Sequence, residues 1–140
     1  MVLKNLEVAM KITHFNDVPI EDVLVEGAKN TKIRWLISKK DNAPNFAMRM
    51  FEVEVGGHTP FHSHDWEHEV FVLQGSGVLV TEDGEKSFQQ WDVIFVEPHV
   101  KHQFKNTDDT LMRFLCVVPH APQPKQSSQN PLGDKPVNNC

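Results

Sequence analysis

The chain has 140 residues, of which 39% are hydrophobic and 24% charged, and its formal net charge is −5. This length predicts one domain with its own core, and the composition is typical of soluble globular proteins. The negative charge and the lack of a dense Lys/Arg cluster argue against a nucleic-acid partner. Because no apolar run is long enough for a membrane span or a signal peptide, we expect a cytoplasmic protein without a membrane partner.

Strand signals recur along the chain, whereas helical signals are weak. Runs of β-branched and aromatic residues bounded by Gly, Pro, Asn and Asp predict strands. They lie at residues 31–38, 46–55, 69–74, 93–96 and 111–118. A short helical turn is expected within 19–28. Asp83-Gly84 lies between two further strand-like segments and predicts a hairpin, since glycine tolerates the positive φ of a tight turn.

Strands every eight to twelve residues without intervening helices predict an all-β sandwich or barrel. We assign residues 1–30 to an N-terminal segment with a strand or short helix, available to join a dimer, and residues 31–118 to the barrel. Residues 119–140 form a Pro-rich tail with few large apolar side chains, which is expected to be extended or disordered. Cys116 and Cys140 are expected to be unbridged thiols.

Three histidines fall within seven residues in HSHDWEH, at positions 62–68. Residues two apart on a strand point the same way, so His62 and His64 share a face. His68 follows a short turn around Asp65-Trp66 and belongs to the next strand, which can lie beside the first. A lone histidine is more often a hydrogen-bonded or surface residue. Converging imidazoles inside a β-barrel instead predict a transition-metal site.

The spacing of these residues resembles the cupins. Their first motif, G-x5-H-x-H-x(3,4)-E-x6-G, is similar to residues 56–75, with His62 and His64 at the two histidine positions. Their second motif, G-x5-P-x-G-x2-H-x3-N, is similar to residues 91–106 and implies His102 as a further ligand. The resemblance covers roughly residues 45–118 and implies a cupin double-stranded β-helix, the jelly-roll barrel.

Three positions of the second motif depart from the family pattern. Trp91 and His99 stand where glycine is usual, and Glu97 stands where proline is usual. The adjacent Pro98 can supply the lost rigidity. These positions shape turns rather than bind metal, so we expect the barrel to be retained.

The first motif departs at the family's glutamate ligand. Counting seven positions back from Gly75 reaches His68 rather than Glu69, although counting forward from His64 allows either residue. Strand parity places His68 on the apolar face, so Glu69 could bind only after a one-residue shift in the turn. The chain then resembles the small four-histidine bacterial cupins, a subgroup associated with manganese and oxidative chemistry. The implied ligands are His62, His64, His68 and His102.

Four neutral imidazoles would leave a divalent ion its full charge of +2, which favours anionic ligands and acidifies bound water. A six-coordinate ion would keep two positions for water, dioxygen, a peroxide or a substrate. We therefore expect a divalent transition metal. The resemblance implies manganese first, with Fe, Ni, Cu or Zn as alternatives. Because ligation requires neutral histidine, we expect metal release as the pH falls through about 6.

Candidate substrate-pocket residues lie on strands that would surround this centre. Arg49 shares the parity of an apolar strand face, and it either anchors a carboxylate substrate or extends to solvent from the strand end. Phe114 and Cys116 share a face of the last strand, and Cys116 is either a pocket residue or a small buried hydrophobe. Phe104 follows His102 by two residues and is expected to line the same pocket.

These features favour an enzyme in which the metal centre is the catalytic group. The first hypothesis is an Mn- or Fe-type oxygenase or oxidase acting on a small organic substrate with O2 or peroxide. The alternatives are a metal-dependent isomerase or lyase, for which no internal base stands out, and a non-catalytic metal-containing sensor or binding protein. We expect a homodimer, because an open antiparallel edge invites pairing.

Overall fold

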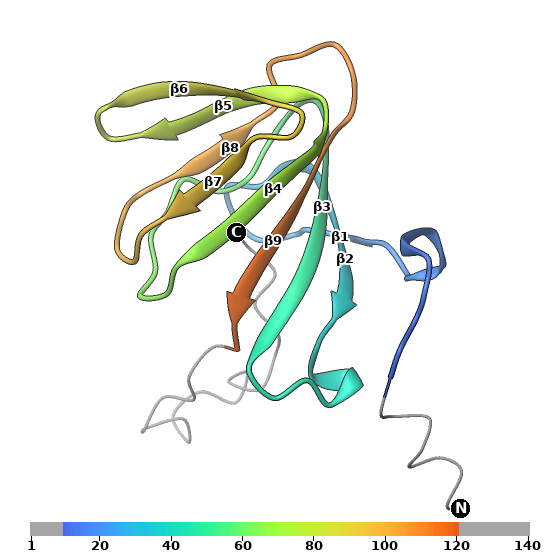
Figure 1. Ribbon diagram of the computed structural model, residues 1–140. Helices are drawn as coiled ribbons and strands as arrows, with labels where there is room; N and C mark the ends of the chain where they lie inside the picture. Colours follow the sequence, from blue (N-terminus) through green and yellow to red (C-terminus); the bar gives the residue numbers. More distant parts are fainter. Residues whose placement is uncertain (1–9, 121–140) are drawn as a thin grey trace, which may run out of the picture.

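The computed structural model describes residues 10–120, which form a curled sheet of nine antiparallel strands (Figure 1). The all-β prediction is therefore confirmed. The strands are β1 (Glu21–Asp22), β2 (Lys29–Ile37), β3 (Phe46–His58), β4 (His68–Gln74), β5 (Ser76–Thr81), β6 (Gly84–Gln89), β7 (Val93–Val96), β8 (Gln103–Lys105) and β9 (Met112–Pro119). Two 3-10 turns, η1 (Phe15–Asp17) and η2 (Lys39–Asp41), accompany them. Within residues 10–120, no helix has the length and apolar character that crossing a bilayer would require.

The long strand β3 organises the sheet. Its 13 residues pair with β2, β8 and β9, and β9 continues the sheet to β4. The resulting strand order is β6-β5-β8-β3-β9-β4-β7, with β2 also on β3 and β1 on β2. The sheet curls so that the β5–β6 hairpin arches over β7 and β8 (Figure 1). This curl encloses the concave side on which the core and the histidines lie.

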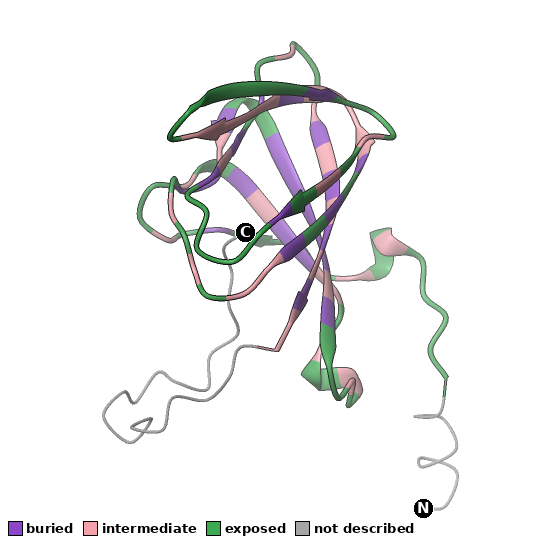
Figure 2. Cartoon of the chain, turned by 60° about the vertical axis from the view of Figure 1, so that its left-hand side comes forward, coloured by how far each residue is buried: buried purple, intermediate pink, exposed green. Residues whose placement is uncertain are grey.

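The core is aromatic. Phe51, Phe104 and Phe114 are completely buried, and the Phe114 ring stacks on both others at centroid distances of 5.3 and 4.8 Å. Burial alternates along β4 and β9, as expected for strands with one face toward the core. Each buried phenylalanine contributes roughly 1.5–3 kcal/mol relative to an exposed one. Figure 2 shows the buried residues concentrated on the central strands and the exposed residues on loops and the outer hairpin.

A buried carboxylate fastens the N-terminal segment to the sheet. Glu52 is 6% exposed, and its Oε2 accepts hydrogen bonds from Nε of Arg34 at 3.2 Å and Nε of Arg113 at 3.1 Å. Both guanidinium groups also lie over the ring of Phe15, at 5.5 and 5.2 Å. Nη1 of Arg34 donates to the carbonyl oxygen of Val18 at 2.7 Å. One carboxylate on β3 therefore links β2 and β9, and the two arginines in turn contact the η1 region.

The strand predictions agree closely with the structure, and the predicted ranges correspond to β2, β3, β4, β7 and β9. The hairpin is also confirmed: Thr81 pairs with Gly84, which has φ +126°, and Glu82-Asp83 form the turn. The helical turn expected within 19–28 is wrong, because β1 pairs there with β2. Residues 1–9 and 121–140, including Cys140 and most of the predicted tail, lie outside the described residues.

The two positions where cupins usually have glycine adopt the backbone that favours glycine. Trp91 has φ +77° and His99 has φ +71°. Their amides make structural hydrogen bonds, from Trp91 N–H to Val72 O at 2.8 Å and from His99 N–H to His64 O at 2.7 Å. The turns are thus retained, as expected, although a side chain in this region costs about 1–2 kcal/mol. The second bond ties the turn to the first histidine motif.

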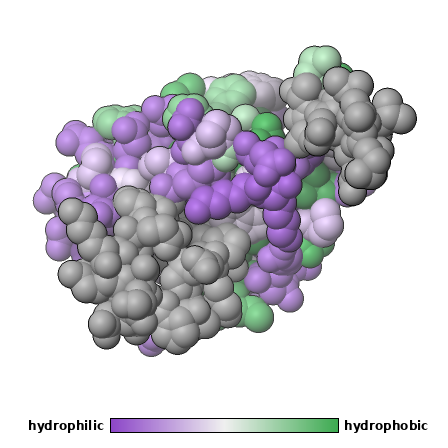
Figure 3. Space-filling model, turned by 90° about the horizontal axis from the view of Figure 1, so that it is seen from below, coloured by the Kyte–Doolittle hydropathy of each residue, from purple (hydrophilic) through white to green (hydrophobic). Residues whose placement is uncertain are grey.

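The edge strand β7 exposes large apolar side chains. Val93 is 78% exposed and Phe95 59% exposed, and Trp91, just before the strand, is 61% exposed. Among the described residues visible from below, by contrast, most are hydrophilic and the hydrophobic areas are smaller (Figure 3). An apolar edge strand of this kind can pair with another chain.

Candidate metal centre

Four histidines from three chain segments meet inside the curled sheet. His62 and His64 lie in the extended loop after β3, His68 begins β4, and His102 immediately precedes β8. His62 and His102 form an isolated antiparallel bridge, in which each amide donates to the other's carbonyl, at 3.1 and 2.9 Å. This bridge joins the two sequence motifs, which are distant along the chain.

The four imidazole rings contact one another. Their centroid distances range from 4.4 Å, between His64 and His68, to 5.2 Å, between His102 and either His62 or His64. One ring nitrogen from each of His62, His64 and His102 lies within 4.8 Å of the others. Nε2 of His68 lies 2.9 Å from Nε2 of His64. At that distance the two nitrogens cannot both direct a proton at each other, so at least one presents the lone pair that a metal requires.

For three of the four rings, a hydrogen-bond acceptor outside the cluster indicates which ring nitrogen faces inward. In three of the rings Nδ1 lies near such an acceptor. The contacts are His102 with Val100 O at 2.8 Å, His64 with Trp66 O at 3.4 Å and His68 with Cys116 Sγ at 3.2 Å. A proton on Nδ1 that is donated outward leaves Nε2 unprotonated for metal binding. The Trp66 ring also stacks on His64 at a centroid distance of 4.3 Å.

Burial favours the neutral form of His64. Desolvation, followed by the charges of the neighbouring imidazoles His68, His62 and His102, lowers the pKa of His64 from 6.5 to about 3. His68 and His102 are only 0% and 1% exposed. Neutral imidazole is the metal-binding form. The ordinary imidazole pKa therefore does not apply to His64, and proton competition at this residue is expected well below pH 6.

The two nearby glutamates lie outside the histidine cluster. Glu69 is exposed on β4, whereas its neighbours His68 and Val70 are buried. A hydrogen bond between the two carboxyl side chains is the main reason why the pKa of Glu67 is raised. The structure thus brings His68, and not Glu69, to the other histidines, in the parity that the strand pattern predicts.

Phe104 and Phe114 form an aromatic wall next to the cluster. The Phe104 ring lies 6.0 Å from the His102 ring and stacks on Phe114. Both side chains are completely buried. Phe104 is thus close to His102, and Phe114 packs against Phe104; the contact of either ring with a substrate stays a prediction.

Arg49 points inward, which agrees with one of the two sequence-based interpretations and contradicts the other. It is 0% exposed, so it does not extend to solvent from the strand end. Its guanidinium group lies over the rings of Trp35 and Phe51, at 5.5 and 5.1 Å. Its Nη2 donates to Cys116 Sγ at 3.1 Å. Cys116 is itself completely buried, between Arg49 and His68.

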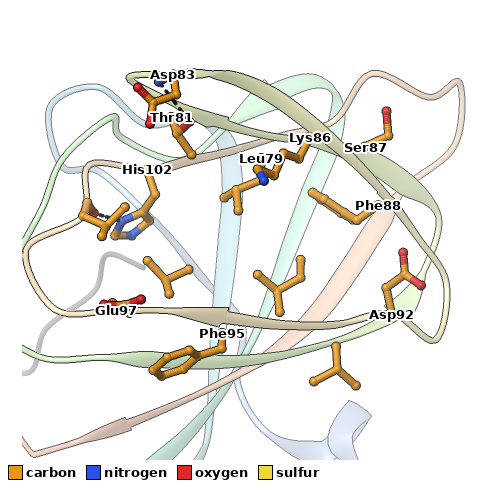
Figure 4. A pocket seen from close by; sticks show the side chains of 14 residues that line it. Leu79, Thr81, Asp83, Lys86, Ser87, Phe88, Asp92, Phe95, Glu97 and His102 are labelled. Atoms are coloured by element: carbon orange, nitrogen blue, oxygen red, sulfur yellow. Dashed lines mark hydrogen bonds between the residues drawn. The ribbon is translucent and has the colours of Figure 1, made fainter.

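A cavity of about 610 Å³ opens between the β5–β6 hairpin and β7, with His102 in its wall (Figure 4). Leu79 and Phe88 supply apolar surface, and Lys86 and Glu97 supply charge. The lining also includes Thr81, Asp83, Ser87, Asp92, Val93, Ile94, Phe95, Val96 and Val100. Among the described residues, this lining does not include the pocket candidates Arg49, Phe104, Phe114 and Cys116.

Sequence reasoning singled out neither Lys86 nor Glu97 as a pocket residue. The one available signal was the occurrence of Glu97 at the usual proline position of the second motif. No local pattern marks Lys86, because its position in the cavity follows from the folding of the β5–β6 hairpin over β7.

Residues 49–118 match the cupin domain family. The chain is similar to the polyketide cyclase RemF from Streptomyces resistomycificus, with 40% identity, 79% of each chain covered and a TM-score of 0.75. It also resembles a cupin-2 domain protein from Rhodospirillum rubrum, at 22% identity, covering 89% of this chain and 88% of that one, with a TM-score of 0.67. The second likeness shows the fold alone.

A further relative is 1-methylthio-D-xylulose 5-phosphate methylsulfurylase from Rhodospirillum rubrum, which is 31% identical over 71 residues, or 51% of this chain. The chain spans 46% of that enzyme's length. The family match extends from Arg49 to Val118 and includes both histidine motifs. With its curled antiparallel barrel and its match over half of its length, the chain belongs to the cupin family.

Proposed function

We propose that this protein is a metal-dependent enzyme that acts on a small, partly apolar substrate with a carbonyl group, catalysing cyclisation or isomerisation. The observation that carries the proposal is the position of the buried histidine cluster, which contributes His102 to the wall of a cavity with mixed apolar and charged lining. The 40% identity to a polyketide cyclase over 79% of both chains supports this reaction class. This reaction class corresponds to the isomerase or lyase alternative of the sequence analysis rather than to the oxygenase or oxidase hypothesis.

The donor set fits a divalent transition metal. His62, His64, His68 and His102 would hold it, through the Nε2 atoms in the three rings whose Nδ1 atoms contact outer acceptors. Imidazole donors suit Zn, Cu, Fe and Ni, and the resemblance to four-histidine cupins adds Mn. When bound, such a cation supplies a Lewis acid that polarises a carbonyl oxygen.

The residues of the cavity would bind the substrate and move its protons. Leu79 and Phe88 present apolar surface for the carbon skeleton and exclude water from it (Figure 4). The Glu97 carboxylate shares the cavity with His102, and it is the group that we assign to accept a proton from the carbon next to the carbonyl. Lys86, on the opposite wall, would stabilise negative charge or return a proton. These groups supply the internal base that the sequence did not reveal.

An Mn- or Fe-type oxygenase using O2 or peroxide at the same histidines is the second candidate. It is supported by the all-imidazole donor set, since His68 replaces the usual carboxylate and leaves a bound cation its full charge. A redox-inert metal discriminates between the candidates, because a Lewis acid needs no change of oxidation state whereas an oxygenase does.

The test uses protein stripped with a chelator and reloaded with Zn²⁺, Mn²⁺ or Fe²⁺. An aryl triketone, a simple substrate for ring closure, is assayed by absorbance and mass spectrometry under air and under argon. We expect the Zn²⁺ form to close the ring equally in both atmospheres, and the His102→Ala protein to lose both metal and activity. Product that forms only with Mn²⁺ or Fe²⁺ in air, with O2 consumption, would establish the oxygenase. A wild-type protein that binds none of the three metals would overturn both candidates.

We also propose that two copies of the chain pair through the apolar β7 edge. Val93 and Phe95 are 78% and 59% exposed there. Exposed apolar side chains of this size support β7 as the contact surface. Replacing Phe95 by lysine should shift the protein from dimer to monomer in analytical ultracentrifugation, whereas Val55→Lys, at a 55% exposed position of β3, should not. A wild-type monomer at high concentration would contradict the proposal.

A further inference from the structure

Three completely buried polar side chains form a chain of contacts that ends at the histidine cluster. Nη2 of Arg49 donates to Sγ of Cys116 at 3.1 Å, and the same sulfur lies 3.2 Å from Nδ1 of His68. All three residues are 0% exposed. The Nε2 atom of His68 then lies 2.9 Å from Nε2 of His64. The sulfur therefore connects the wall of the barrel to the cluster.

The register of the sheet places these groups together. Arg49 on β3 is the direct partner of Cys116 on β9, and Cys116 is in turn the partner of Val70 on β4. His68 lies two residues before Val70 and points to the same face of β4. The guanidinium group of Arg49 also lies over the rings of Trp35 and Phe51. Its N–H group is thus held at the sulfur by packing as well as by hydrogen bonding.

We propose that Cys116 is a positioning residue for the metal centre. Its sulfur accepts a hydrogen bond from the Nδ1–H group of His68, which fixes the tautomer with an unprotonated Nε2 directed at the other histidines. Arg49 keeps the sulfur in place. This role rests on the proposed metal site, and it explains why a thiol and a guanidinium group are buried together behind a ligand rather than in the cavity lining.

The contact affects metal affinity through preorganisation. Without the sulfur acceptor, the His68 proton can move to Nε2, and the ring can rotate away from the orientation required for binding. Metal binding must then restore the tautomer and the orientation of the His68 ring. This requirement weakens metal affinity although all the ligands are still present. Loss of a hydrogen-bonding partner of a metal-bound histidine typically costs about 10–100-fold in metal affinity.

The experiment measures Zn²⁺ affinity of the full chain by competition with a chromophoric chelator. Cys116→Ala removes the acceptor, Cys116→Ser restores one, and Val118→Ala is a matched truncation two residues away on the same buried face of β9. We expect Cys116→Ala to bind Zn²⁺ about 10–100-fold more weakly. Cys116→Ser and Val118→Ala should both remain within about threefold of wild type, since they respectively keep an acceptor and leave the His68 contact intact.

A wild-type measurement makes the test independent of variant folding. In Zn²⁺-loaded protein labelled with ¹⁵N histidine, NMR should show a proton on Nδ1 of His68 that exchanges slowly with solvent. A proton on Nε2, or no protected proton on Nδ1, would overturn the proposal. Thermal melting of each apo-variant would show whether an altered affinity simply follows altered stability.

The outcomes separate this proposal from the proposed function. If wild type and all three variants bind Zn²⁺ equally, the metal site stands and the role of Cys116 is wrong. If Cys116→Ala and Val118→Ala weaken binding equally, or Cys116→Ser fails to restore it, packing rather than hydrogen bonding is responsible, and the proposal is again wrong. If wild type binds no metal, both proposals fail together.

Discussion

Replacing His68 by alanine tests whether the metal centre contains four histidines or three. His68 is the residue at the usual glutamate position, and the three-nitrogen group within 4.8 Å comprises His62, His64 and His102. His68 is expected to be the fourth ligand because its Nε2 lies 2.9 Å from Nε2 of His64 and its side chain is on the buried face of β4. The exposed Glu69, one residue later, provides a matched control.

The size of the effect follows from the number of ligands. Four-ligand zinc sites bind with apparent free energies of about 10–16 kcal/mol, so one ligand of four accounts for roughly 2.5–4 kcal/mol. Because 1.4 kcal/mol corresponds to a factor of ten, His68→Ala should weaken Zn²⁺ binding about 60- to 700-fold. Most of this range exceeds the loss of about 10–100-fold expected for Cys116→Ala, which removes only an orienting contact.

The assay is Zn²⁺ competition by isothermal calorimetry, with circular dichroism to confirm folding. His68→Glu should retain tight binding, because it restores the ligand that other cupins have at this place, and Glu69→Ala should bind like wild type. If His68→Ala matches wild type, the ligand set is the three-histidine group and the parity argument fails. If Glu69→Ala loses affinity instead, the turn has the one-residue shift that the structure excludes.

Three further predictions concern stability. The pKa of His64 is lowered from 6.5 to about 3 in the folded chain, so the unfolded chain binds the proton first, and the melting temperature of the apoprotein should fall as the pH decreases between these values. If the melting temperature does not change over this pH range, burial of this imidazole does not govern acid stability. The same conclusion follows if the His64→Gln variant has the same pH dependence of the melting temperature as wild type. Glu52→Gln removes the negative charge that compensates two arginines, whose Nε atoms lie 3.2 and 3.1 Å from the carboxylate. It should lower the free energy of unfolding, measured in urea, by about 3–5 kcal/mol. A loss below about 1 kcal/mol would mean that solvent screens these ion pairs. His99→Gly should raise the free energy of unfolding by up to about 1 kcal/mol, because glycine relieves the φ of +71°, whereas a decrease would indicate that the imidazole itself makes a stabilising contact.

Much of the fold was predictable because it depends on local patterns. Alternation of apolar and polar residues located β2, β3, β4, β7 and β9, and Asp83-Gly84 located the hairpin. Parity along β4 placed His68 inward and Glu69 outward, as the structure has them. The short β1 strand within 19–28 was missed, since it is defined by pairing with β2 rather than by a pattern of its own.

Local patterns along the chain thus predicted five of the strands and the β5–β6 hairpin, because these follow from periodicity and turn residues. The candidate ligands His62, His64, His68 and His102 followed from motif spacing and the resemblance to the cupins. Which side chains meet across strands depends instead on the three-dimensional fold. The pairing of Arg49 with Cys116 depends on the β3–β9 register, and the approach of Glu97 to the cavity depends on the curl of the sheet. The pKa of His64 likewise depends on its burial and on three neighbouring imidazoles that come from separate segments. Such contacts and electrostatic effects arise from distances in space, which no one-dimensional pattern specifies.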